Sequence, residues 1–432
     1  TKERGERMEE KKKLSILLAA AVLLCGIYVP AKAQERGDGV TVTTQEEFMA
    51  ALARNEKLIT ISGLITIGKD AESSGRLLPV VFPAGTVVQG TGEGSILNCR
   101  SPIQLGGDGV AFRNMKLTME SSKALGSVPH REIFLAGHSL TMDNVYTYLK
   151  GPSGEFGDLG DGEKELLPTI YAGGYPGTAV GDSASLTVQN SNRETMFQAI
   201  YMGHGAVDGD VPYQGTASLD LDAKAIVREA VDTSLNSKAE VRVSGSSDID
   251  YAKAEQFTGN SNTTLTVSNC TVDHADVRGI GNLVVENGGQ LKVINETLEN
   301  VTLKNGGCLN LNEIANHVQI KGNFSGVSSP DEEKGILVLN KAGFVEIQGT
   351  VAGTTVFCAS DRGALGGIYA GKSYISANPS TKQESFVLHP KHVENGFELE
   401  YENGVWKTAG NIFDTRHVKG VSVKHAPREV NL

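Results

Sequence analysis

The chain has 432 residues and a formal charge of −11, with 51 glycines, 13 prolines and a single tryptophan. Its length predicts two or three domains, or one elongated repeat. Glycine makes up roughly an eighth of the chain and aromatic residues only 6%, which is typical of many short strands joined by tight turns. The acidic balance argues against nucleic acid or an anionic membrane surface as a partner, because both attract positive charge.

Residues 1–33 carry the pattern of a secretory signal peptide. Met8 is the expected true start, and Lys11–Lys13 form a basic region ahead of the apolar run Leu14–Val29. Residues 31–33 then match the A-x-A cleavage pattern. The apolar run is short for a membrane anchor. We therefore expect a secreted, extracellular protein without membrane insertion after cleavage.

Removal of this segment makes the chain more acidic. Seven basic and four acidic residues leave with it, so 33 basic and 47 acidic residues remain, a formal charge of −14. No cofactor is indicated, although this charge leaves calcium open as a bound ion. The remaining cysteines form no C-x-x-C pair and have no histidine at metal-ligand spacing, so no metal site of the zinc type is expected. We expect them to be small buried hydrophobic residues, with a disulfide left open; they are Cys99, Cys270, Cys308 and Cys358.

Residues 34–56 are predicted to form an N-terminal arm and a short capping helix. Thr44 and Glu47 fit a capping box, in which the side chain of each accepts a hydrogen bond from the backbone of the other. Residues 45–54 then have helical periodicity, with Phe48, Met49 and Leu52 on one face. The helix would cover the apolar end and the open strand edges of the domain that follows.

The main domain, residues 57–408, repeats strand-sized phrases. SLTMDN at 139–144, SLTVQN at 185–190 and TLTVSN at 264–269 share one pattern. Alternate residues of each phrase point to the same side, so the apolar ones face a common interior. The final asparagine would end the strand in the left-handed conformation. NLVVENGGQL and NVTLKNGGCL follow one another at an offset of 18 residues, about one coil of a solenoid.

These repeats predict an all-β fold, a right-handed single-stranded parallel β-helix. An antiparallel sandwich is the competing fold, but hairpin signals are scarce before residue 400. No further helix is expected before about Asn403. The segment from Phe397 to Trp406 predicts a hairpin with Asn403-Gly404 at its turn, and Trp406 closing the far end of the solenoid. Residues 409–432 are expected to be a linker and the start of a truncated module.

The whole pattern resembles the pectate-lyase-like adhesive domain of bacterial cell-surface proteins. The resemblance lies in VTTQEEFMAAL at Val42–Leu52, in LITISGLITI at Leu58–Ile67 and in the [ST]LT[MV]xN phrases. It implies a secreted β-helix used for attachment, with a host or environmental glycan or protein as its partner and no catalysis. His417–Leu432 resembles the first strand of a bacterial immunoglobulin-like module. A monomeric module attached to the cell wall or cell surface is the corresponding expectation.

The alternative is a polysaccharide lyase or glycoside hydrolase, because these enzymes share the scaffold and chemistry depends on the site. Polygalacturonase-like enzymes carry N-T-D, D-D, G-H-G and R-I-K in that order. This chain has only the third motif, at Gly203-His204-Gly205. No catalytic residue is therefore assigned, and His204 is expected to lie on a surface or in a loop.

A projecting loop is predicted near residues 151–178, where the chain is rich in glycine and acidic residues. Asp158, Asp161 and Glu163 could hold calcium, although their spacing does not match an EF-hand loop. Tyrosines concentrate in and after this segment, and tyrosines on loops commonly recognise sugars or proteins. Packing of the loop against the solenoid remains the alternative role. The candidate ligand surface is Tyr171, Tyr175, Tyr201, His204 and Tyr213.

Overall fold

A computed structural model describes residues 39–68, 78–92, 94–119, 131–147, 167–205, 212–245, 251–360 and 368–410, without the side chains of 251–255. All of these residues belong to one compact unit. The predicted signal peptide and the immunoglobulin-like start at His417 lie outside the described residues. No helix in the described ranges has the length and apolar character needed to cross a membrane.

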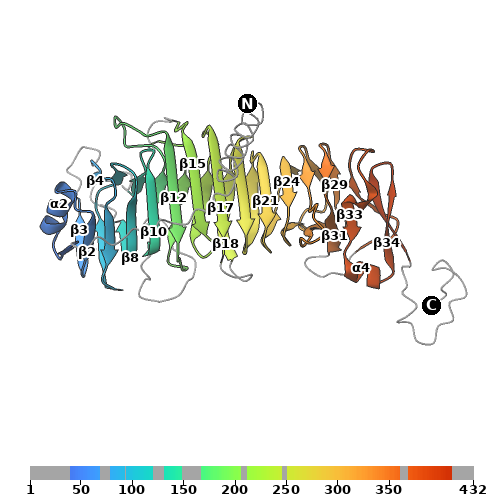
Figure 1. Ribbon diagram of the computed structural model, residues 1–432, viewed down its shortest axis with the longest axis horizontal. Helices are drawn as coiled ribbons and strands as arrows, with labels where there is room; N and C mark the ends of the chain where they lie inside the picture. Colours follow the sequence, from blue (N-terminus) through green and yellow to red (C-terminus); the bar gives the residue numbers. More distant parts are fainter. Residues whose placement is uncertain are drawn as a thin grey trace, which may run out of the picture. The chain divides into compact units, whose positions relative to one another are not determined.

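Within the described ranges, the chain winds through three sheets whose strands stack along the solenoid (Figure 1). The first sheet has 15 strands, here in order, with the side pair β3 and β6 at the end: β1 Val40–Val42, β2 Leu58–Ile61, β5 Val87–Gly90, β8 Val110–Met119, β10 Ser139–Tyr146, β12 Ser183–Gln189, β15 Thr216–Asp222, β17 Lys238–Ser244, β19 Thr263–Ser268, β21 Asn282–Glu286, β24 Asn300–Leu303, β27 Phe324–Ser325, β30 Val351–Ala352, β3 Leu64–Ile67 and β6 Ile96–Cys99.

The second sheet of the described residues has 14 strands and carries the surfaces discussed below. In order from the N-terminal end, with β13 pairing at the side of β16, they are β4 Val80–Phe82, β7 Ile103–Leu105, β9 Glu132–Phe134, β11 Thr169–Tyr171, β14 Ala199–Tyr201, β16 Ile226–Asp232, β18 Tyr251–Thr258, β20 Thr271–Arg278, β22 Gln290–Val293, β25 Cys308–Leu311, β28 Gly335–Asn340, β31 Thr355–Ser360, β33 Phe386–Leu388 and β13 Met196–Phe197.

The third sheet has six strands in the described C-terminal part: β23 Thr297–Leu298, β26 His317–Ile320, β29 Phe344–Ile347, β32 Ser373–Ser376, β35 Val405–Gly410 and β34 Phe397–Glu402. The helical elements are α2 Gln45–Ala53, the 3₁₀ turn η2 Gln383–Ser385 and α4 Pro390–Glu394. Among the strands of the described residues, every pair in the first two sheets is parallel, and β35 pairs antiparallel with β32 and β34; three isolated antiparallel bridges lie outside the strands. The predicted parallel β-helix is confirmed.

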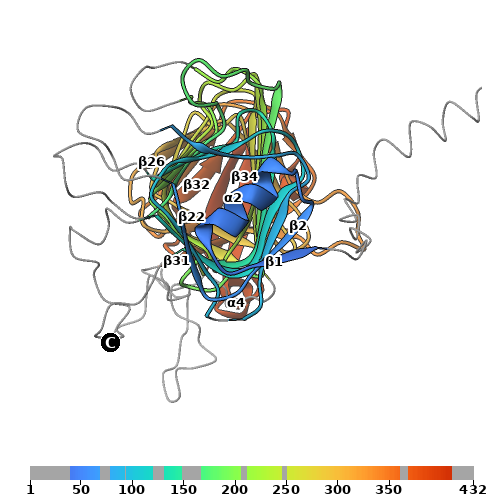
Figure 2. The ribbon, with the colours of Figure 1, turned by 90° about the vertical axis from the view of Figure 1, so that its left-hand side faces the viewer.

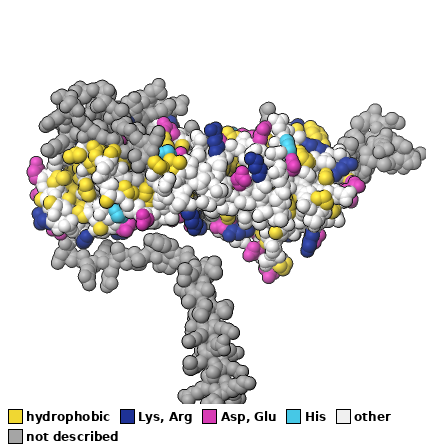
Figure 3. Space-filling view, turned by 90° about the horizontal axis from the view of Figure 1, so that it is seen from above, with side chains coloured by type: hydrophobic (Ala, Val, Ile, Leu, Met, Phe, Trp, Pro, Cys, Tyr) yellow, Lys and Arg dark blue, Asp and Glu magenta, His cyan; other side chains and the backbone are white. Residues whose placement is uncertain are grey.

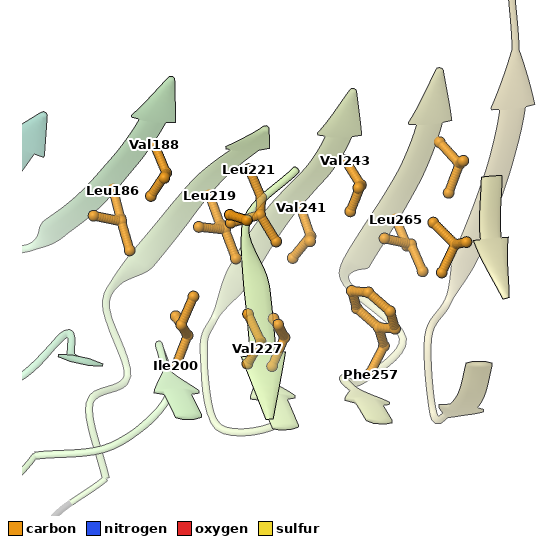
Figure 4. Packing of buried hydrophobic residues seen from close by; sticks show 14 of the residues in the cluster. Leu186, Val188, Ile200, Leu219, Leu221, Val227, Val241, Val243, Phe257 and Leu265 are labelled. Carbon is orange, nitrogen blue, oxygen red and sulfur yellow. The ribbon is translucent and has the colours of Figure 1, made fainter. Parts of the chain in front are cut away.

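The repeated phrases occupy equivalent positions in this stack. Ser139 pairs with Ser185 and Leu140 with Leu186, so SLTMDN lies directly beside SLTVQN on the next coil. TLTVSN stands three strands further on, with Leu265 in the same inward row. Figure 4 shows Leu186, Leu219, Val241 and Leu265 in line, facing the second sheet. All of these side chains are at most 3% exposed, so the coils share one continuous core.

The asparagines after these phrases adopt the predicted left-handed conformation, with φ of 53° at Asn144, 52° at Asn190 and 53° at Asn269. Asn190 and Asn269 directly follow the ends of β12 and β19, as predicted. Asn144 differs, because β10 continues past it to Tyr146. There the left-handed residue bends a strand instead of ending it, and the Asn144 amide donates to Asn114 Oδ1 at 2.9 Å on the preceding coil.

The N-terminal end of the stack is covered by α2, as Figure 2 shows from that end. The capping box at Thr44 and Glu47 is confirmed, and the helix ends at Ala53, one residue before the predicted end. Phe48 is fully buried and meets Phe82 edge-on, with ring centroids 6.2 Å apart. Phe48 and Leu52 of the predicted apolar face are therefore buried on the first coils, whereas Met49 of that face is 37% exposed.

The C-terminal end is a hairpin of β34 and β35, as predicted. Its turn residues Asn403 and Gly404 have φ of 48° and 82°, which is the left-handed pair that a type I′ turn requires. Trp406 is fully buried, and its Nε1 donates to Gln383 O at 2.9 Å. Its ring lies between Phe386 and Tyr401, with centroids 4.9 and 4.8 Å away.

Two boundaries predicted from the sequence are wrong. The helix α4 precedes the hairpin, where no helix was expected; Pro390 stands in its first turn and His389 Nδ1 accepts a hydrogen bond from Lys391 N. The predicted loop near 151–178 extends too far, because Thr169–Tyr171 form β11 inside the second sheet. Residues 151–166 of that loop lie outside the described ranges.

The cysteines behave as small apolar residues. No disulfide joins the four cysteines in the described ranges, and Cys99, Cys270 and Cys358 are buried. Burial raises the pKa of Cys99, and it raises the pKa of Cys308 to about 11 and that of Cys358 to about 12. Thiols with such raised pKa values are poor nucleophiles at neutral pH.

Candidate functional site

Four coils of the second sheet place a row of large side chains on its outer side. The register aligns Gln104 of β7, Phe134 of β9, Tyr171 of β11 and Tyr201 of β14. The neighbouring isoleucines of the same strands point into the core, as the alternation of a strand requires. The sequence could not show this alignment, because the coils that carry these residues are separated by loops of unequal length.

We call Phe134, Tyr171, Tyr175, Tyr201 and His204 the tyrosine face. Tyr171 stacks on Phe134 with ring centroids 5.7 Å apart and lies 5.5 Å from Tyr201, and His204 meets Tyr201 edge-on at 5.5 Å. Phe134 is fully buried and Tyr171 is only 7% exposed. Tyr175, Tyr201 and His204 are half-buried and therefore present the accessible aromatic surface.

The turn formed by residues 172–181 folds back over this row. Tyr175 N donates to Gln104 Oε1 at 3.0 Å, a contact with a coil 71 residues earlier, and the Tyr175 ring meets Phe134 edge-on at 6.1 Å. Gly173 N donates to His204 O at 2.9 Å. A Cβ atom at Gly173 would lie 2.6 Å from Gly205 Cα, so glycine is required for this close approach. The turn thus fixes Tyr175 in place.

Carboxylates border the exposed part of the tyrosine face. His204 Nε2 lies 3.2 Å from Asp232 Oδ2, and the Gln198 amide donates to Glu229 Oε1. Burial and the nearby charges of Glu229 and Asp232 raise the pKa of Tyr201, so its phenol stays protonated and can donate a hydrogen bond. Flat rings next to fixed donors and acceptors are what a sugar ring contacts when it is bound.

Tyr213 does not belong to this exposed surface. It is only 6% exposed, and its hydroxyl donates to Gly181 O at 3.2 Å. Burial and the charge of Asp182 raise its pKa to about 12. Tyr213 therefore supports the 172–181 turn from below, which is the packing role that the sequence had left open.

Further along the same sheet, β22, β25, β28 and β31 border a groove of about 740 Å³. We call it the amide groove, because four amide side chains line it: Gln290, Asn310, Asn312 and Asn340. Lys292 and Glu313 line it as well. Ala315, Val338, Cys358 and Ser360 complete its wall. Sequence reasoning missed this site, although Gln290 occupies an outward position in the first of the two phrases spaced by 18 residues and Asn310 directly follows the second.

The acidic residues do not gather into a metal site in the part of the chain that the structure describes. No group of three or more histidine, cysteine, aspartate or glutamate residues there is arranged to hold a metal ion. Asp158, Asp161 and Glu163, the calcium candidates, lie outside the described residues. The two surfaces above are therefore the candidate sites.

The surface of the N-terminal coils also carries exposed apolar side chains. On the side of the molecule seen in Figure 3, hydrophobic side chains gather over the N-terminal coils. Exposed apolar residues of those coils include Leu78 and Val81, which are 75% and 47% exposed.

No model of a known protein family matches the chain, and no curated protein matches it either.

Proposed function

We propose that this chain is a non-catalytic binding module of a bacterial surface protein, and that its tyrosine face recognises a host or environmental glycan or protein. The observation that carries the proposal is the half-buried aromatic surface of Tyr175, Tyr201 and His204 above a rigid sheet. Such a surface is organised before the ligand arrives, so little ordering entropy is lost on binding. Its geometry favours a glycan, because the hydrogen-bonding groups of Gln198, Glu229 and Asp232 border the rings.

The setting of the module rests on the sequence. The signal-peptide pattern of residues 1–33 supports secretion, and the resemblance to pectate-lyase-like adhesive domains supports attachment at a cell surface. The resemblance of His417–Leu432 to an immunoglobulin-like strand supports a module displayed in series with others. We propose that it acts as a monomer.

One observation favours the alternative of a polysaccharide lyase or hydrolase. His204 is 3.2 Å from Asp232, and Glu229 lies beside the same tyrosine, so a base and a second carboxylate share one surface. Glycoside hydrolases work with paired carboxylates, and lyases with a base close to the sugar. A direct assay separates this alternative from pure binding.

The test of binding compares the protein with two variants on arrays of glycans and matrix proteins. Tyr201→Ala removes an accessible ring and should abolish the strongest signals. Tyr369→Ala is the matched control, since Tyr369 is 50% exposed at the other end of the solenoid and should leave the signals unchanged. No binding by the unaltered protein, or equal binding by Tyr201→Ala, would contradict the proposal.

The test of catalysis uses polygalacturonate and alginate as substrates. Unsaturated products, followed by ultraviolet absorbance, and released reducing ends are both expected to stay at background. Turnover that disappears in His204→Ala would replace the binding proposal with the enzymatic alternative.

A further inference from the structure

We infer that the amide groove is a second binding site and that it takes an uncharged polysaccharide chain. Its volume of about 740 Å³ lies within the range of ~300–1,000 Å³ typical of ligand sites. It lies on coils other than those of the tyrosine face, so the inference stands whether or not that face binds a ligand.

Asn312 supplies the first argument. Its side chain is only 9% exposed, and its Oδ1 has no hydrogen-bond partner among the described residues. A buried polar atom without a partner is costly, so native proteins rarely keep one without a reason. Asn312 lines the groove, and Asn310 beside it uses only its Oδ1, which accepts from Asn312 N at 3.0 Å. The amide nitrogens of both side chains are left to donate to a ligand.

The charges of the groove supply the second argument. Lys292 Nζ lies 2.9 Å from Asp273 Oδ1, and His274 bridges Asp273 and Glu313 at 3.1 and 2.9 Å. Among the described residues that line the groove, Lys292 is the only cation and is thus already paired with Asp273, and the carboxylate of Glu313 lines the groove as well. An anionic sugar would meet carboxylates without a free cation, which disfavours uronates. An uncharged ligand avoids this repulsion.

The position of the groove on the sheet supplies the third argument. A peptide backbone usually binds by adding a strand to a sheet edge. The four strands that line the groove, β22, β25, β28 and β31, are each paired on both sides, so the described part of the groove has no open strand edge. Lys292, Asn310 and Val338 are in register on successive coils, about 4.8 Å apart. Beside this row, Asn340 of β28 is in register with Ser360 of β31, so polar side chains of the groove continue from Asn310 over the next two coils. A linear polymer with hydroxyls along its length can follow these side chains, because amide and hydroxyl groups both donate and accept hydrogen bonds.

The experiment measures binding of neutral hexasaccharides of β-1,4-glucan, β-1,4-mannan, β-1,4-xylan and α-1,4-glucan by calorimetry, with oligogalacturonate as the acidic comparison. Asn312→Leu keeps the volume but removes the amide, and should raise Kd about tenfold for the one or two hydrogen bonds lost. Ala315→Trp is the second variant; Ala315 is exposed at the rim, so a large ring there should block the groove without disturbing the core. Thermal melting checks that both variants are folded.

Tyr201→Ala separates the two sites, because it should leave binding in the groove unchanged. Tight binding of a neutral hexasaccharide that both groove variants weaken would support the inference. Binding lost only in Tyr201→Ala would place the ligand on the tyrosine face and overturn the groove while leaving the proposed function intact. The inference also fails if no neutral hexasaccharide binds or if oligogalacturonate binds more tightly than the neutral chains.

Discussion

The tyrosine face and the amide groove lie on the outer side of the same sheet, yet they are built for different tasks. Beneath both, inward side chains such as Ile170 and Leu309 are fully buried in one core. Above β9 and β11 the outward residues are aromatic, and the 172–181 turn covers most of them. Above β25 and β28 they include the amides of Asn310 and Asn340, and a groove remains open. Outward positions can therefore vary from coil to coil, while the inward ones keep the stack together.

The comparison predicts a division of labour. Aromatic residues that are covered contribute to stability, whereas amides that are left without partners weaken it and serve binding. Substitutions in the covered aromatic row should therefore lower the unfolding free energy, whereas substitutions of the unpartnered amides should weaken binding with little effect on stability.

The largest effect is expected for Phe134→Ala. Phe134 is fully buried beneath Tyr171 and Tyr175 although it points away from the central core. Loss of the ring should cost about 3–5 kcal/mol of unfolding free energy, as for a phenylalanine in a core. Chemical denaturation followed by circular dichroism measures it, with Phe257→Ala of the central core as the reference. A change in unfolding free energy near zero would show that the buried ring of Phe134 does not contribute to stability.

A smaller and more local loss of stability is expected at β31, which borders the amide groove, when the pH is lowered. His392 Nε2 accepts a hydrogen bond from Ala359 N of β31, the strand that also carries Cys358 and Ser360. Burial, together with the neighbouring His389, lowers the pKa of His392 from its ordinary 6.5. The folded state then binds fewer protons than the unfolded chain, so stability is full above about pH 6.5 and falls as the pH drops through that value.

Hydrogen exchange should show this loosening in β31 before it appears in β11 when the pH is lowered from about 7.5 to about 5.5. His392→Gln can still accept from Ala359 N but does not titrate, and should remove the difference. Equal loosening of β31 and β11 in the unaltered protein would show that acid acts on the whole stack.

The smallest effect is expected for Asn312→Leu, the groove variant that weakens binding. It removes an unpartnered buried oxygen and keeps a similar volume, so unfolding free energy should change by less than about 1 kcal/mol and could rise. Denaturation under the conditions used for Phe134→Ala measures it. A loss of several kcal/mol would show that Asn312 is a structural residue, and the contrast between the two regions would fail.

The sequence predicted the elements whose signals are local. The capping box at Thr44, the left-handed Asn190 and the Asn403-Gly404 turn each depend on a few adjacent residues, and all three are confirmed. The [ST]LT[MV]xN phrases predicted the inward row, because its demands repeat at every coil. The repetition of these phrases was therefore enough to predict the parallel β-helix.

The sites were predicted only in part. The tyrosines were singled out by composition, but their exposure depends on which coil lies beside which, and so Tyr213 was misplaced on the surface. The amide groove joins residues from Gln290 to Ser360, and its registers pass through loops whose lengths set the pairing. Such alignment is a property of the stacked coils rather than of any one segment.

The antiparallel hairpin at one end gives the solenoid a mechanical polarity. Tension between residues 39 and 410 would act across the strand pairs one coil at a time, because each coil contacts only its neighbours. At the N-terminal end β1 is held to β2 by three residue pairs, whereas at the other end β35 pairs with both β32 and β34 and buries Trp406. Peeling should begin at β1, so a tethered molecule under load would lose its tyrosine face before its amide groove.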